Sequence, residues 1–83
     1  MLGEDGNIYC VPCDATCVLV INPSTMELST IGEGKIPTGR DKFQGGFTCG
    51  KDRNIYFMPE TASVILKIVI ETQEVVVIDT VDN

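Results

Sequence analysis

The feature that most constrains this chain is a repeat of its own sequence at an offset of 47 residues. Residues 3–9 read GEDGNIY, and residues 50–56 read GKDRNIY. The match continues without a gap to residues 32 and 79, and twelve of the thirty aligned positions are identical. The further identical pairs are Pro12/Pro59, Ala15/Ala62, Leu19/Leu66, Ile21/Ile68, Thr25/Thr72, Glu27/Glu74 and Ile31/Ile78. Such a match indicates an internal duplication and predicts a fold built from two similar units.

Both copies contain the same alternation of turn signals and short apolar runs. The sequences DGN and DRN favour hairpin turns, because Asp, Gly and Asn tolerate a positive φ. Pro12 and Pro59 each end a run, since proline cannot donate to a strand ladder. Apolar runs of about five residues predict strands buried on both faces, and no window has helical periodicity. The predicted strands are residues 7–12, 17–22 and 27–31 in the first copy and residues 43–49, 54–59, 64–70 and 75–80 in the second.

The 83 residues are predicted to form one small all-β repeat domain. Residues 1–32 are the first unit, residues 33–42 a linker loop, and residues 43–83 the second unit, a four-stranded antiparallel meander. Gly, Pro and charged residues dominate the linker, which predicts an exposed connection. Two adjacent glycines, Gly45 and Gly46, predict a close approach of neighbouring backbones. Their equivalents would precede the N-terminus, so we expect the first unit to lack its first strand.

The pattern of the two copies is similar to kelch-like and YVTN-like β-propeller repeats. In the first copy, DGNIY at residues 5–9 is followed by VLVINPST at residues 18–25. The second copy contains GGF at 45–47, DRNIY at 52–56, Pro59 and VILKI at 64–68. Four-stranded units that recur every 40 to 50 residues or so are typical of propeller blades. The resemblance covers nearly the whole chain and implies two tandem blades of a partial β-propeller, but no particular activity.

Some differences from the propeller pattern affect how the blades are covered. Propellers usually have about four to eight blades, whereas this chain has two copies. The second copy has lost the Asn-Pro turn, with Ile70 in place of Pro23. It also has Lys67 where the first copy has Val20. A charged side chain in a strand predicts that this face of the second blade, or this end of the strand, meets water.

Charge and hydropathy argue against several classes of partner. The net charge is −6, which disfavours nucleic acid, since its binding depends on Lys and Arg. Residues 1–6 have neither a basic segment nor an apolar core, so no signal peptide is predicted. The longest apolar run, residues 17–21, is too short to span a bilayer. We therefore expect no nucleic-acid or membrane partner, and an intracellular location by default.

The four cysteines are the first candidates for chemistry. Cys10, Cys13 and Cys17 form a C-x2-C-x3-C pattern, Cys49 lies far away, and the chain has no histidine. The aligned pairs are Cys10/Phe57, Cys17/Val64 and Leu2/Cys49. Because cysteine packs readily as a small hydrophobe, we predict that Cys10, Cys17 and Cys49 are mostly buried and unpaired. A disulfide and a metal or redox site remain alternatives.

No other motif predicts a catalytic, cofactor-binding or metal-binding residue. The GEGK sequence at residues 32–35 lacks the spacing and the helix of a phosphate-binding loop. Turn formation explains Asp5 and Asp52 better than calcium binding, which needs more oxygen ligands. Glu27 and Glu74 are expected at the surface, where strands begin. Without histidine, and with no Ser or Cys beside a plausible base, a catalytic triad is not available.

The sequence therefore predicts a non-catalytic β-propeller-type repeat module for interaction or structure. The alternatives are an inactive fragment of a longer propeller protein and part of a propeller hydrolase with a metal in a central channel. Two blades cannot close a propeller, and open apolar edges pair with other chains. We expect self-association through open blade edges, into a ring of about three or four copies or into aggregates. The competing expectation is a monomeric two-blade sandwich with Lys67 in water.

Overall fold

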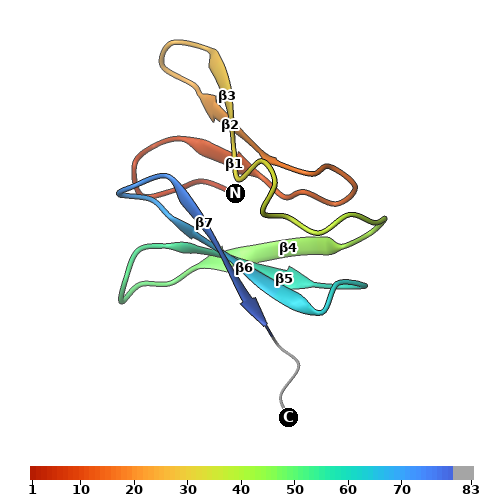
Figure 1. Cartoon of the computed structure of the whole chain (residues 1–83). Coiled ribbons are helices and arrows are strands. Elements are labelled where there is room, and N and C mark those ends of the chain that lie inside the picture. The colour runs from red at the N-terminus through yellow and green to blue at the C-terminus, as the bar shows by residue number, and fades with distance from the viewer. Residues whose placement is uncertain (80–83) are drawn as a thin grey trace.

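The computed structural model describes residues 1–79, which form an all-β fold of two open antiparallel sheets (Figure 1). The first sheet contains, in order, β1 (Ile8–Cys10), β2 (Val18–Asn22) and β3 (Glu27–Ile31). The second contains, in order, β4 (Phe43–Thr48), β5 (Ile55–Pro59), β6 (Val64–Val69) and β7 (Glu74–Asp79). Each sheet is a meander of consecutive strands, and the two sheets lie one above the other.

The order of strands confirms the prediction, and the differences lie at the strand ends. Most strands begin or end within one residue of their predicted bounds, and β3 has the predicted bounds. The first strand is shorter than predicted, because the N–H of Cys13 turns back to the carbonyl of Val11 at 3.0 Å. Thr80, the predicted last residue of the final strand, lies outside the described residues. Within residues 1–79, no helix has the length and apolar character needed to cross a membrane.

The hydrogen-bonding register repeats together with the sequence. Tyr9 pairs with Val20 in the first sheet, and their equivalents Tyr56 and Lys67 pair in the second. Every pair between β2 and β3 has its counterpart 47 residues later between β6 and β7. The internal duplication is therefore a duplication of strand pairing as well as of sequence.

The two sheets bury opposite faces despite this common register. The inward side chains of the first sheet are Tyr9, Val18 and Val20. Those of the second sheet are Ile55, Phe57, Leu66, Ile68 and Val75, and Phe43 and Ile36 complete the core. Tyr56, the counterpart of Tyr9, lies between two inward residues of β5 and so points away from the core. The sheets therefore pack face to back, with one core between them.

The prediction that the apolar strands are buried on both faces is wrong. Each sheet packs against a single neighbour within the described residues, so the other face of each sheet stays open. The outer strands are the most exposed, and the side chain of Leu28 on β3 is 66% exposed. The expectation for Lys67 agrees with this arrangement, because Lys67 lies on the face of β6 that points away from the core.

The N-terminal residues cover the inner edge of β1. Leu2 forms an isolated bridge with Ile8, and the N–H of Tyr9 donates to the carbonyl of Met1 at 2.7 Å. The first copy has no full first strand, as expected, but the N-terminal residues pair with β1 at the position of that strand. The open edge expected for the first unit is therefore paired with the N-terminal residues of the chain itself.

The linker contributes to the core, although it was predicted to be exposed. Ile36 belongs to the core cluster, and the side chain of Lys42 is only 1% exposed. The Lys42 ammonium donates to the carbonyls of Ala15 at 2.8 Å and Gly39 at 3.1 Å. A buried ammonium requires such acceptors, and the backbone N–H of Lys42 also donates to the carbonyl of Cys13. The linker is thereby fixed to the loop between β1 and β2.

Candidate functional site

Each copy carries the same hydrogen-bonded cluster at its first turn. Asp5 accepts hydrogen bonds from the backbone N–H of Asn7 at 3.0 Å and from the hydroxyl of Tyr9 at 2.6 Å. Asp52 accepts the equivalent bonds from the backbone two residues later and from the hydroxyl of Tyr56. These contacts confirm the predicted turn-forming role of both aspartates.

The two tyrosines of this cluster have different surroundings. The Tyr9 hydroxyl also accepts a hydrogen bond from Nε2 of Gln73 at 2.7 Å, which joins the two sheets. Burial raises the pKa of Tyr9, and its bonded aspartate raises it further. Tyr56 instead lies on the outer side of the second sheet. Its ring stacks on that of Phe47, with the two ring centroids 5.6 Å apart. The Lys67 ammonium lies 5.9 Å from the centroid of the Tyr56 ring. The same motif is an inter-sheet contact in one copy and a surface feature in the other.

The hydrogen bond to Asp52, together with partial desolvation, raises the pKa of Tyr56 to about 12. The phenol is stabilised in the folded chain, so this stabilisation is present below pH 10.0, the ordinary pKa, and is lost as the pH rises toward 12. We expect Asp52→Asn to move one tyrosine transition toward pH 10 in an absorbance titration. The matched variant Asp5→Asn should move the other transition less, because burial is the first cause at Tyr9. Unchanged transitions in Asp52→Asn would contradict the expectation.

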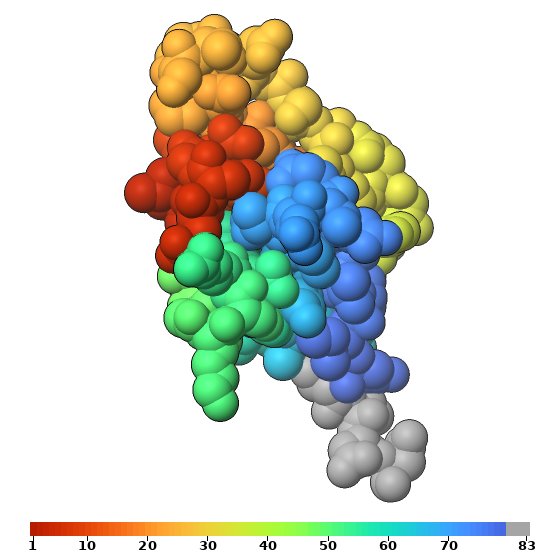
Figure 2. Space-filling view, turned by 90° about the vertical axis from the view of Figure 1, so that its left-hand side faces the viewer, coloured from red at the N-terminus to blue at the C-terminus, as the bar shows by residue number. Residues whose placement is uncertain are grey.

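The two repeated turns border one acidic depression with a volume of about 430 Å³. Its charged lining residues are Glu4, Asp5, Asp52, Arg53 and Glu71. Figure 2 looks onto the side where the red N-terminal segment, the green β4–β5 turn and the blue β6–β7 turn meet. The structure thus brings Asp5 and Asp52 to one place. Both carboxylates are already engaged by their own turns, so the depression defines no ligand set.

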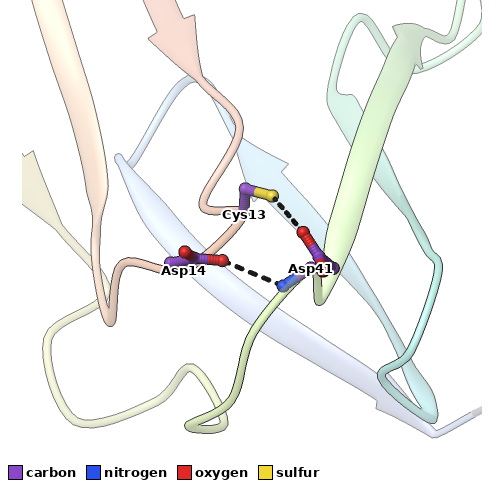
Figure 3. Close-up of side chains that lie close together, drawn as sticks. All are labelled: Cys13, Asp14 and Asp41. Atoms are coloured by element: carbon purple, nitrogen blue, oxygen red, sulfur yellow. Dashed lines mark hydrogen bonds between the residues drawn. The ribbon is translucent and has the colours of Figure 1, made fainter.

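One group of three metal-ligating side chains occurs among the described residues, and it consists of Cys13, Asp14 and Asp41 (Figure 3). The Cys13 thiol donates to Oδ1 of Asp41 at 3.6 Å, and the backbone N–H of Asp41 donates to Oδ1 of Asp14 at 2.9 Å. Partial desolvation and the two carboxylates raise the pKa of Cys13. Three donors are fewer than the four ligands of a closed zinc site, and two of them, Cys13 and Asp41, are hydrogen-bonded to each other. We therefore interpret the trio as a link between the β1–β2 loop and the linker.

The prediction for Cys10, Cys17 and Cys49 is confirmed in part: they are unpaired and partly buried, but they do not pack in the core. All four cysteines have free thiols and are partly exposed, and the core cluster contains none of them. Cys10 follows the inward-pointing Tyr9 on β1, so its side chain lies on the opposite, open face. The equivalent of a core residue in one copy is therefore a surface residue in the other.

The first hairpin departs by one residue from the gapless alignment. The N–H of Gly3 donates to the carbonyl of Asn7 at 2.8 Å, whereas the carbonyl of the equivalent Asn54 accepts from Cys49 at 3.0 Å. Cys49 therefore occupies the structural place of Gly3 and not that of Leu2. The turn of the first copy is one residue shorter, which the sequence alignment conceals.

The other sequence candidates have surface or turn roles. Residues 32–35 form a turn, closed by a bond from the N–H of Lys35 to the carbonyl of Gly32 at 3.0 Å. Glu27 and Glu74 are exposed, as predicted. Each accepts a hydrogen bond from the hydroxyl of the threonine two residues earlier.

Two apolar faces remain open at opposite ends of the two-sheet stack. The open face of the first sheet consists of Ile8, Cys10, Leu19, Ile21 and Leu28. The open face of the second sheet includes Phe47, Tyr56, Ile65, Lys67, Val76 and Ile78. Their side chains are partly or largely exposed. Both faces are preformed by paired strands, so a partner could bind without ordering the backbone.

Comparisons of the chain with protein-family models, with curated proteins and with solved structures find no match. Neither the acidic depression nor the cysteine cluster provides a complete set of catalytic or metal-binding groups. We therefore infer function from the packing of the sheets and from the two open faces.

Proposed function

We propose that this chain is a non-catalytic repeat module of the β-propeller type, in which each copy is one blade. Its role is structural or interactive: it presents sheet faces on which further units or partners stack. The resemblance of both copies to kelch-like and YVTN-like repeats supports this proposal, as does their common strand register. No residue is assigned to catalysis.

The face-to-back packing of the two sheets carries the proposal. Tyr9 and Val20 lie inward in the first sheet, while their counterparts Tyr56 and Lys67 lie outward in the second. Two equivalent faces packed together would form a closed pair. A face-to-back stack instead leaves one face of each kind free, so it can continue from unit to unit. Blades in propellers follow one another in this way around a ring, and units in other repeat proteins do so in an open row.

Adding a third copy by covalent fusion is expected to stabilise the protein. The fusion joins a second copy of residues 33–79 directly to residue 79 of the first. At this junction Asp79 is replaced by glycine (Asp79→Gly). This change is needed because the equivalent Gly32 has a φ of 79°, and a Cβ there would lie 2.6 Å from Cγ2 of Val75. The added copy would cover the open face of the second sheet, and each fully buried Leu or Ile contributes about 1.5–3 kcal/mol. We expect one cooperative urea transition at a higher midpoint than that of the 83-residue chain.

The matched control carries Leu66→Asp in the added copy alone, which places a charge in the new core. Its unfolding midpoint should stay at that of the unfused chain. Separate unfolding of the added copy, or a midpoint no higher than that of the control, would contradict the proposal. A far-ultraviolet spectrum without β-structure for the isolated chain would favour the inactive-fragment alternative.

A further inference from the structure

We infer that the open faces bind a second copy of this chain, head to tail. The open face of the first sheet in one molecule packs on the open face of the second sheet in the next. This inference rests on the proposed function, and it names the partner and the two surfaces. It also moves the expected contact from strand edges to sheet faces.

The open face of the first sheet has the same design as a face that is already buried within the chain. Its residues correspond, at the offset of 47, to the inward residues of the second sheet. The pairs are Ile8/Ile55, Cys10/Phe57, Leu19/Leu66, Ile21/Ile68 and Leu28/Val75. The strand register on the two faces is also the same. The first sheet therefore presents outward a surface of the kind that the second sheet packs into the core.

The open face of the second sheet has the complementary design. Tyr56, Ile65 and Ile78 correspond to Tyr9, Val18 and Ile31, which pack in or against the core from the first sheet. The internal interface packs the Tyr9 face of the first sheet on the Ile55 face of the second sheet. The two open faces are the equivalent of each: the Tyr56 face of the second sheet and the Ile8 face of the first. They can meet only between two molecules, unless the internal interface opens.

The margins of the internal interface show what the second interface would contain. Gln73, in the β6–β7 turn, contacts Tyr9 across the sheets. Its counterpart Met26 has the same φ of 63° in the β2–β3 turn and is 73% exposed. In the head-to-tail pair, Met26 of one molecule would reach Tyr56 of the next. Met26 and Leu28 are the most exposed large apolar side chains of the first copy. Both therefore lie at contact positions of the second interface.

Two positions weaken the second interface relative to the internal one. Lys67 replaces Val20, so an ammonium must lose water at the contact, and this has a cost in free energy. Cys10 replaces Phe57, so less apolar area is buried. The net charge of −6 adds repulsion between copies, which salt screens. We expect association in the micromolar range that strengthens with added salt. Because the contact is heterologous, it produces rings or open chains of molecules.

The first test measures the mass of the intact chain by sedimentation equilibrium at about 1 to 200 µM. We expect a mass above that of the 9.0 kDa chain at the upper concentrations. Lys67→Val restores the residue of the internal interface and should lower the dissociation constant roughly tenfold. Leu28→Glu should raise it at least about tenfold, whereas the control Thr38→Glu adds the same charge at an exposed position of the linker, outside both sheets, and should change it little.

The second test mixes two blocked variants, Leu28→Glu and Ile78→Glu, each of which keeps one open face intact. Each alone should be largely monomeric, and the equimolar mixture should form a 1:1 complex and no larger species. A wild-type chain and a Lys67→Val chain that both stay monomeric overturn the inference. So does association that survives in one blocked variant alone, since that indicates contact between like faces. A stabilised three-copy fusion together with a monomeric parent overturns this inference and leaves the proposed function intact.

Discussion

Replacing Gly46 by alanine is expected to detach β4 from the second sheet and to lower the free energy of unfolding by about 3 kcal/mol. A Cβ at Gly46 would overlap the carbonyl oxygen of Tyr56 and come within 2.9 Å of the ring of Phe57. The carbonyl belongs to β5, so relief requires the paired strands to separate. Urea unfolding monitored by circular dichroism measures the loss.

The adjacent glycine provides the control for this experiment. A Cβ at Gly45 would meet no atom within 4 Å. Gly45→Ala should therefore leave stability unchanged or raise it by about 0.5 kcal/mol, because alanine restricts the unfolded chain. Equal effects of Gly45→Ala and Gly46→Ala would show that the loss at Gly46 comes from backbone flexibility and not from close approach.

Phe57→Ala is expected to lower the free energy of unfolding by about 3–5 kcal/mol. Phe57 is fully buried in the core between the two sheets, and its truncation leaves a cavity that strands of both sheets border. Domains of this size are stable by only about 5–10 kcal/mol. Much of the variant should therefore be unfolded at 37 °C, which thermal unfolding and near-ultraviolet circular dichroism would measure.

Phe47→Ala makes the same change on the other side of the same sheet. Phe47 is exposed, and its ring contact is the stack on Tyr56. We expect a loss of about 1 kcal/mol or less, measured in dilute solution so that association does not contribute. If both phenylalanine variants lost equal stability, the assignment of the core to one face of the second sheet would be wrong.

The strands and their pairing could be predicted because their causes are local and occur twice. Turn signals such as DGN and DRN begin each copy, Pro12 and Pro59 end the same strand, and the duplicated apolar runs then pair in order. The role of one glycine was also predictable, since the close backbone approach expected for the glycine pair occurs at Gly46. No such close approach occurs at Gly45, where an added Cβ would meet no atom within 4 Å.

The burial of each face could not be predicted from the same patterns. Tyr9 and Tyr56 lie in nearly identical local sequences, yet one is buried and the other faces outward. The difference depends on which neighbour each sheet has, and this is a property of the chain as a whole. For the same reason the alignment of Cys10 with the buried Phe57 misled the prediction for the cysteines.

The candidate contacts of the linker had no signal in the sequence. Asp14 and Asp41 are 27 residues apart and meet only because the linker folds back on the β1–β2 loop. The burial of Lys42 likewise depends on carbonyl groups that the folded loops supply. Periodicity detects neither, since it reports on the residues of one strand and not on loops that converge in space.

The opposite burial of the two copies has a consequence for the effect of mutations. Each aligned strand position that packs in the core in one copy has a twin on an open face in the other. The same substitution therefore changes the core when it is made in one copy and an open face when it is made in the other. Val20 and Lys67 are such twins. We therefore expect a change that lowers stability in one copy to act, at its twin, on the association between molecules instead.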